Sequence, residues 1–131
     1  MGRTTAEIRQ ERLDKDPAFR ERWERTAVAR AVANAVIRYP ANQGWTQTRL
    51  AKELGLQQPQ VARLESGEHN PTFETLQRVS RMLGLRFIVD VIPPSFSFEQ
   101  VESPVGIVLD EETTSSGRVV VTTFGLYQKV G

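Results

Sequence analysis

The stretch "WTQTRLAKELGLQQPQVARLESGEHNP" (Trp45 to Pro71) contains two short amphipathic segments separated by a glycine. In each segment the apolar residues recur at the three- and four-residue spacing of one helical face. These positions are Leu50, Ala51, Leu54, Val61 and Leu64. Gly55 lies between the segments, where a residue without a Cβ permits a sharp turn. We therefore predict two helices that cross at a steep angle, with their apolar faces together.

Helix-start and helix-stop residues divide the surrounding sequence into three short helices. Thr46 is suited to cap the first helix, because its hydroxyl can accept a hydrogen bond from a free backbone N–H. The second helix is predicted from about Gln58 to Ser66, and Pro71–Thr72 opens a third that continues to Leu83. A glycine follows each helix, at Gly55, Gly67 and Gly84.

The order of these residues is similar to that in one family. The matching positions are Thr46, Gln47, Leu50, Ala51, Gly55, Gln58, Val61, Arg63, Leu64, Glu65, Gly67, Asn70, Pro71 and Leu76. In this order they resemble the Cro- and repressor-type helix-turn-helix family, also called the xenobiotic-response-element family. The resemblance covers about residues 37–85 and implies a DNA-binding protein whose second helix of the pair lies in the major groove. It also implies a homodimer on a two-fold DNA operator, because one such domain offers few phosphate contacts.

The resemblance places four outward-facing residues near DNA bases: Gln58, Pro59, Gln60 and Arg63. Glutamine can pair with adenine and arginine with guanine, each worth about 1–3 kcal/mol of discrimination. Pro59 falls in the first helical turn, where its missing N–H has no partner in the helix, and its ring can touch a thymine methyl group. Simple solvation is the alternative for the glutamines, and a phosphate or the surroundings of Glu65 is the alternative for Arg63. Glu65 itself is expected to support the fold.

Contacts with DNA phosphates are expected at a helix start and in the loop after the second helix. The residues there are Thr46, Gln47, His69 and Asn70. Gln47 matches a position that the family uses on phosphate, and the family brings the loop near the DNA backbone. His69 is the only histidine and there is no cysteine, so we expect no metal site and no cofactor, and a solvated turn is the alternative reading of His69. We expect Trp45 to pack ahead of the Thr46 cap.

The segment before the helix pair reads as one long helix. Asp16–Pro17 is a typical helix start, with the acid as cap and proline in the first position. No helix-breaking residue follows until Pro40, and residues 27–37 are almost entirely apolar, which predicts that this half is buried. By composition, Pro40–Gly44 is predicted to be a loop.

The segment after Gly84 changes from a helical period to the alternation of β-strands. Strands are predicted at residues 86–92, 105–109 and 118–124, with the acidic turn "DEETTSSG" (110–117) joining the last two as a hairpin. The predicted fold class is therefore mainly α with a small C-terminal β part.

We divide the chain into a charged helical extension (1–25), a helix-turn-helix DNA-binding domain (26–85) and a β-strand extension (86–131). Three short strands cannot bury a core alone, so they pair with a second subunit or lie against the helices. On this ground we expect the last part to contribute to dimerisation.

Composition sets the broad class. The chain has 131 residues, 39% of them hydrophobic and 25% charged, which is ordinary for a soluble globular protein. We expect no membrane span and no signal peptide, and therefore a cytoplasmic protein. Residues 1–92 carry 15 Lys+Arg and 11 Asp+Glu, whereas residues 93–131 carry two and five. This asymmetry favours an anionic partner for the front part, although a solvated surface also explains it.

The full layout, with a charged N-terminal helix, the central domain and a strand after "LGLRF" (83–87), resembles HigA-type antitoxins. That resemblance implies a repressor that binds a small ribonuclease toxin of the RelE-like class and represses its own operon. Residues 7–25 then form a toxin-binding or dimerising surface, or simply a solvated helix. The alternatives are a regulator without a toxin and a protein–protein inhibitor that no longer reads DNA. No nucleophile–base set or paired carboxylates are evident, so we do not expect an enzyme.

Overall fold

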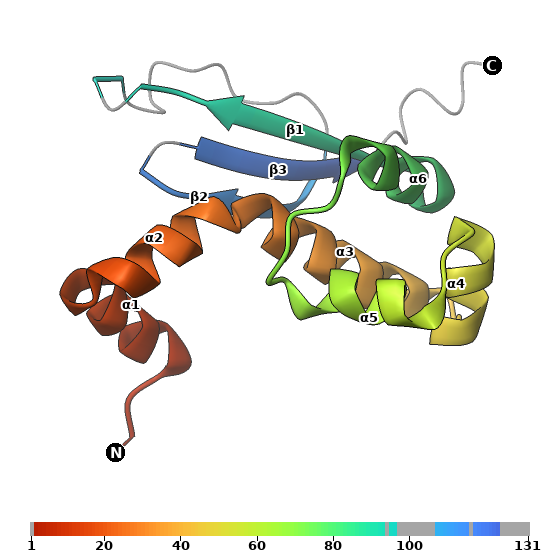
Figure 1. Ribbon diagram of the computed structural model, residues 1–131, viewed down its shortest axis with the longest axis horizontal. Coiled ribbons are helices and arrows are strands. Elements are labelled where there is room, and N and C mark those ends of the chain that lie inside the picture. The colour runs from red at the N-terminus through yellow and green to blue at the C-terminus, as the bar shows by residue number, and fades with distance from the viewer. Residues whose placement is uncertain (1, 94, 97–106, 116, 124–131) are drawn as a thin grey trace.

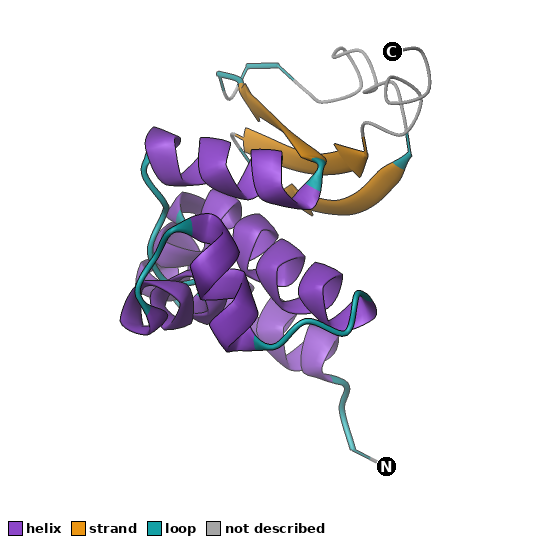
Figure 2. Ribbon diagram, turned by 90° about the vertical axis from the view of Figure 1, so that its right-hand side faces the viewer, coloured by secondary structure: helices purple, strands orange, loops and turns teal. Residues whose placement is uncertain are grey.

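A computed structural model describes residues 2–93, 95–96, 107–115 and 117–123. These residues form six helices followed by a three-stranded antiparallel sheet (Figure 1). The sheet lies over the helices as a second layer (Figure 2). This arrangement confirms the predicted fold class. Within the described residues, no helix combines the length and the apolar character that a membrane crossing requires.

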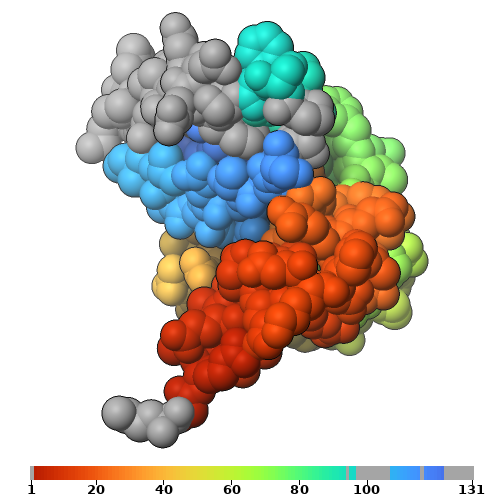
Figure 3. Space-filling view, turned by 90° about the vertical axis from the view of Figure 1, so that its left-hand side faces the viewer, coloured from red at the N-terminus to blue at the C-terminus, as the bar shows by residue number. Residues whose placement is uncertain are grey.

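The N-terminal extension consists of two helices, α1 (Thr5–Lys15) and α2 (Pro17–Arg25). The predicted helix start is confirmed, because Asp16 Oδ1 accepts a hydrogen bond from Phe19 N at 3.1 Å and proline opens α2. Helix α1 lies at the end of the molecule that is away from the sheet (Figure 3), whereas Glu24 of α2 accepts a hydrogen bond from Ser115 Oγ, in the turn between the last two strands, at 2.5 Å. None of the α1 residues is buried.

Arginine–aromatic contacts hold α1 against α2. The guanidinium of Arg12 lies 4.1 Å from the ring centroid of Phe19, and that of Arg9 lies 5.1 Å from the centroid of Trp23. Stacking of this kind is favourable where an aromatic ring is partly exposed. The charged surface of the extension is therefore also its packing surface.

The prediction of one helix from Pro17 to Pro40 is wrong. The helix breaks at Thr26 (φ −104°, ψ 21°), and a new helix, α3 (Ala27–Asn42), begins after it. The hydroxyl of Thr26 donates to the backbone oxygen of Arg22 at 2.7 Å, and such back-bonding competes with the helical hydrogen-bond pattern.

The predicted loop at Pro40–Gly44 is also wrong in its first three residues, which belong to α3. Pro40 is buried in the last turn of the helix, where the missing N–H of proline removes one backbone hydrogen bond. Its oxygen accepts from Trp45 N at 2.8 Å, which closes the helix end against the next element.

The three short helices are α4 (Gln47–Leu54), α5 (Gln58–Ser66) and α6 (Phe73–Leu83). Their predicted bounds are confirmed, with helix-capping threonines at 46 and 72. Gly55, Gly67 and Gly84 follow the helices with φ of +68°, +67° and +64°. A side chain at these positions would be strained, which explains why glycine ends each helix.

The sheet contains β1 (Leu85–Val91), β2 (Val108–Thr113) and β3 (Gly117–Thr123), in the spatial order β1-β3-β2. The hairpin of β2 and β3 is confirmed, but the predicted second strand ends too soon, because β2 continues past Leu109 to Thr113. Asp110 to Thr113, predicted as turn, are strand residues, and the register shifts between Val108 and Asp110. Residues 105–106 and 124 of the predicted strands lie outside the described residues.

The sheet and the helices share one hydrophobic core. Leu85, Val119 and Val121 from the sheet belong to the same buried cluster as Ala31 and Ala35 of α3. The strands therefore lie against the helices of their own chain. A role of this region in dimerisation stays a prediction.

Candidate nucleic-acid interface

The packing of α4 on α5 fixes which side of α5 faces outward. The predicted inward residues are all buried: Leu50, Ala51, Leu54, Val61 and Leu64. Because Val61 and Leu64 face the core, the residues at the start of α5 on its other side are exposed. This confirms the predicted orientation of the helix pair.

Gln58 is held by the neighbouring helix. Its Nε2 donates to Thr48 Oγ1 at 2.9 Å. This bond uses one of the two amide hydrogens and leaves the other, together with Oε1, unused. Those are the two groups that a glutamine needs to pair bidentately with adenine. The contact with Thr48 therefore positions the side chain and leaves Oε1 and one amide hydrogen for another partner.

Gln60 is arranged differently. Its Oε1 accepts a hydrogen bond from the backbone N–H of Gln57 at 2.8 Å, as the acceptor of a capping interaction at the start of α5. Only the amide hydrogens remain unused. Bidentate pairing of Gln60 with adenine would therefore require its oxygen to be shared or released, whereas donation to a single base acceptor would not.

Arg63 and Pro59 are exposed on the same side of α5. Within the described residues, the guanidinium of Arg63 makes no hydrogen bond and no ion pair. Gln60, Arg63 and His69 line one hollow of about 220 Å³ beside α5. The fold thus brings Gln60, Arg63 and the loop residue His69 to one hollow, and base contact by any of the predicted residues stays a prediction.

The start of α4 contains two of the residues that are predicted to contact phosphate, Thr46 and Gln47. Thr46 Oγ1 accepts from Arg49 N at 3.1 Å, as expected for the cap. The guanidinium of Arg49 lies 4.4 Å from the ring centroid of Trp45, which packs against the core. The sequence analysis does not single out Arg49 or Thr48, although both lie in the first turn of α4. The structure places Arg49 over Trp45 and joins Thr48 to Gln58.

Gln47 bridges the two helices instead of pointing freely outward. Its Nε2 donates to Glu65 Oε2 at 2.7 Å, near the end of α5. Burial raises the pKa of the Glu65 carboxyl above its ordinary value of 4.5. Gln47 retains a second amide hydrogen for a phosphate, and Glu65 supports the fold as expected.

Asn70 has a structural role that the sequence did not reveal. Its Oδ1 accepts from Ala29 N at 3.0 Å, and its Nδ2 donates to the backbone oxygen of Arg25 at 2.8 Å. Because Thr26 makes no side-chain cap at the start of α3, Asn70 caps that helix from 41 residues away. A phosphate contact by the Asn70 side chain would compete with these bonds, whereas His69 beside it is exposed.

Comparison with known proteins identifies the same segment. The model of a helix-turn-helix family matches residues 41–88. Antitoxin HigA1 of Mycobacterium tuberculosis (strains H37Rv and CDC 1551 / Oshkosh) is 32% identical over 83 residues, which are 62% of this chain. The HTH-type transcriptional regulator SutR of Escherichia coli K12 is 26% identical over 77 residues, or 59% of this chain.

The predicted resemblance to helix-turn-helix proteins is thereby confirmed. The chain spans about half the length of these relatives, with 56% of HigA1 and 43% of SutR covered. No solved structure matches the chain significantly.

Proposed function

We propose that the protein is a sequence-specific DNA-binding transcriptional repressor that reads its operator with the first turns of α5. The observation that carries this proposal is the orientation of α5. Burial of Val61 and Leu64 leaves Gln58, Gln60 and Arg63 exposed at the start of the second helix of a helix-turn-helix pair. That part of the recognition helix is the one that faces base edges in the major groove.

The mechanism combines positioning on phosphates with readout of bases. The free backbone N–H groups at the start of α4, beside Thr46 and Gln47, provide an anion site, and Arg49 adds a positive charge. Gln58 and Arg63 supply the donors for base edges, and Pro59 supplies an apolar contact. Occupancy of a promoter then blocks transcription. Each half-site takes one protomer of a homodimer, with residues 86–131 contributing to dimerisation.

The similarity to HigA1 supports a more specific role as the antitoxin of a type II toxin–antitoxin pair. In this role the protein neutralises a RelE-like ribonuclease toxin in the cytoplasm and represses its own operon. The charged arm of α1 and α2 is the surface that we assign to the toxin. It projects from the body and leaves the surface of α5 free (Figure 1).

The similarity to SutR favours a second candidate, a regulator without a toxin partner. The two candidates share the DNA-reading surface and differ only in the partner of the arm. A third possibility, a protein–protein inhibitor that no longer reads DNA, is separated from both by the DNA-binding test.

The DNA-binding test uses a labelled duplex of the sequence directly upstream of the protein's own reading frame. We expect saturable binding that weakens steeply with added salt, because phosphate contacts release counterions. An unrelated duplex of equal length is the control. Equal affinity for both duplexes would contradict sequence-specific repression.

The toxin test co-expresses the chain with the product of the neighbouring reading frame. The antitoxin role predicts that the two proteins co-elute, and that deletion of residues 2–25 abolishes co-elution while the upstream duplex is still bound. Specific DNA binding without co-elution would favour the regulator without a toxin.

A further inference from the structure

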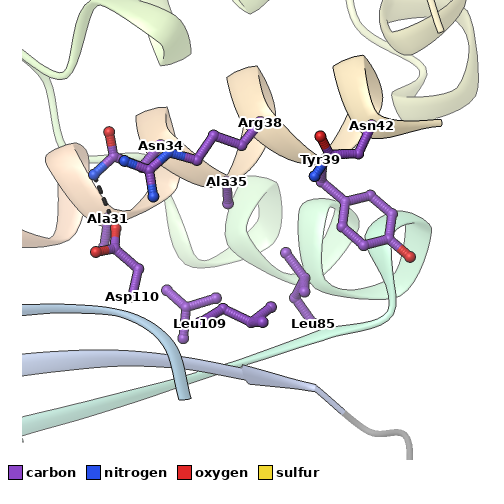
Figure 4. A pocket seen from close by; sticks show the side chains of 10 residues that line it. Ala31, Asn34, Ala35, Arg38, Tyr39, Asn42, Leu85, Leu109 and Asp110 are labelled. Carbon is purple, nitrogen blue, oxygen red and sulfur yellow. Dashed lines mark hydrogen bonds between the residues drawn. The ribbon is translucent and has the colours of Figure 1, made fainter. Parts of the chain in front are cut away.

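A cavity of about 310 Å³ lies between α3 and the sheet, away from α4 and α5 (Figure 4). Helix α3 borders it with two parallel rows of side chains at four-residue spacing. One row is Ala31, Ala35 and Tyr39, and the other is Asn34, Arg38 and Asn42. The sheet closes the other side with Leu85, Leu109 and Val121. The alanines create the space, because they leave room between the helix and the sheet.

The cavity has a charged end and a mainly apolar end that also carries the Asn42 amide. Figure 4 shows the Arg38 side chain running along α3 toward Asn34, above Asp110, whereas Leu85 and Tyr39 lie at the opposite end. A ligand that fits this distribution has charge at one end and an apolar body at the other.

The two charges at this end do not form an ion pair with each other. Asp110 Oδ2 accepts from Asn34 Nδ2 at 2.8 Å, and its Oδ1 accepts from Glu111 N at 3.0 Å. Within the described part of the chain, Arg38 makes no hydrogen bond or ion pair. By contrast, the arginine two turns earlier in α3 does form an ion pair with β2, since Arg30 Nε lies 3.2 Å from Glu112 Oε2.

We propose that this cavity binds a free amino acid with an apolar side chain, whose carboxylate pairs with Arg38 and whose ammonium group pairs with Asp110. The apolar side chain lies against Leu85, Val121 and the Tyr39 ring. Arginine suits the carboxylate because its planar group donates two parallel hydrogen bonds. The carboxylate of Asp110 retains lone pairs for an ammonium group.

Helix α3 lies between the cavity and α5, which carries the proposed DNA-reading surface. On another side, α3 contacts the end of α5, where Ala33 Cβ lies 3.5 Å from the position that a Cβ of Gly67 would take. The ligand proposal nevertheless does not depend on DNA binding, because the test below uses the free protein.

The experiment titrates the full chain with L-phenylalanine while NMR follows the methyl signals of Leu85 and Val121. The comparison ligands are phenethylamine, which lacks the carboxylate, and 3-phenylpropionate, which lacks the ammonium group. We expect each to bind at least about tenfold more weakly than L-phenylalanine, since each loses one charge-assisted pair.

Two variants make the test specific. Arg38→Met should weaken L-phenylalanine about tenfold and leave phenethylamine unchanged, whereas Asp110→Asn should weaken L-phenylalanine and leave 3-phenylpropionate unchanged. Arg81→Met and Glu111→Gln, which change charge outside the cavity, should bind L-phenylalanine like the unmodified protein. Thermal melts of all four variants verify folding.

Absence of methyl shifts with millimolar L-phenylalanine, L-leucine and L-tryptophan would overturn the proposal. Equal loss of all three phenyl ligands in both cavity variants would also overturn it. Contacts of these methyl groups with a second copy of the chain would show that the cavity is a subunit interface instead.

Discussion

Helix α3 packs against two different neighbours, and the two interfaces are built on different principles. The interface with the helix-turn-helix pair is apolar, and it is closed by leucine, valine and alanine side chains that are almost fully buried. The interface with β2 is fastened by polar pairs, Arg30 with Glu112 and Asn34 with Asp110, and it leaves a cavity. The apolar interface sets the orientation of the proposed DNA-reading helix, whereas the interface with β2 leaves a cavity that has room for a ligand.

Truncation of the apolar interface should have the largest effect on stability. Leu50 is 1% exposed, and Leu50→Ala should lower the free energy of unfolding by about 2–5 kcal/mol, through lost burial and the cavity left behind. Leu109, at the interface of α3 with β2, is 45% exposed. Leu109→Ala should therefore change the free energy of unfolding by no more than about 0.5 kcal/mol. Urea unfolding of both variants measures the difference, and equal losses would show that the two interfaces are packed alike.

Removal of a charge from the polar interface should have an intermediate effect. Glu112→Gln leaves the largely buried Arg30 guanidinium without its anion, and we expect a loss of about 1.5–3 kcal/mol in unfolding free energy. Glu111 is adjacent in sequence and exposed, so Glu111→Gln is the matched control and should be near neutral. If both variants unfold at the same urea concentration, the ion pair does not fasten the sheet.

Asn70 joins the loop after α5 to the start of α3, and its replacement should cost about 1 kcal/mol. Asn70→Ala removes the cap on Ala29 and the bond to Arg25, whereas His69→Ala removes an exposed side chain and should be neutral for stability. Comparing the two variants by thermal unfolding and by DNA binding separates structural from phosphate-contacting roles. A stability loss for His69→Ala would contradict this division.

Glu65 should produce the smallest effect, and the effect should depend on pH. Because burial raises the folded-state pKa of this carboxyl above 4.5, the folded state binds more protons than the unfolded state just above that pH. Stability from this group is present below pH 4.5 and is lost as pH rises through the raised pKa. Glu65→Gln has no titrating group at this position and does not lose this stability. The unfolding free energy of the variant, minus that of the unmodified protein, should therefore increase by a few tenths of a kcal/mol as the pH rises from 4.5 through the raised pKa. A difference that decreases with pH would contradict the sign.

Sequence patterns predicted the helix-turn-helix part closely because its determinants are local. Thr46, Gly55 and Gly67 act on backbone groups within a few residues, and the apolar spacing of α4 and α5 fixes their inward faces. The position of α5, and hence the exposure of Gln58 and Arg63, follows from these signals.

The features that the sequence patterns did not predict depend on contacts between residues that are far apart in the chain. Glu112 meets Arg30 across 82 positions, so no local pattern indicates that "DEET" (110–113) is a strand. The break at Thr26 is completed by Asn70, and burial permits Pro40 inside α3. The sequence also does not distinguish the hydrogen bonds of Gln58 from those of Gln60, because both are glutamines in the same helical turn.

The central claim, that the exposed start of α5 reads DNA sequence, is tested most directly by selecting bound duplexes from a random pool. The unmodified protein should enrich a two-fold sequence. Arg63→Ala should lose preference at one base pair in each half-site, at a cost of about 1–3 kcal/mol. Arg81→Ala, which removes an exposed arginine of α6, should enrich the same sequence as the unmodified protein. An unchanged preference in Arg63→Ala, or no enrichment by the unmodified protein, would contradict the claim.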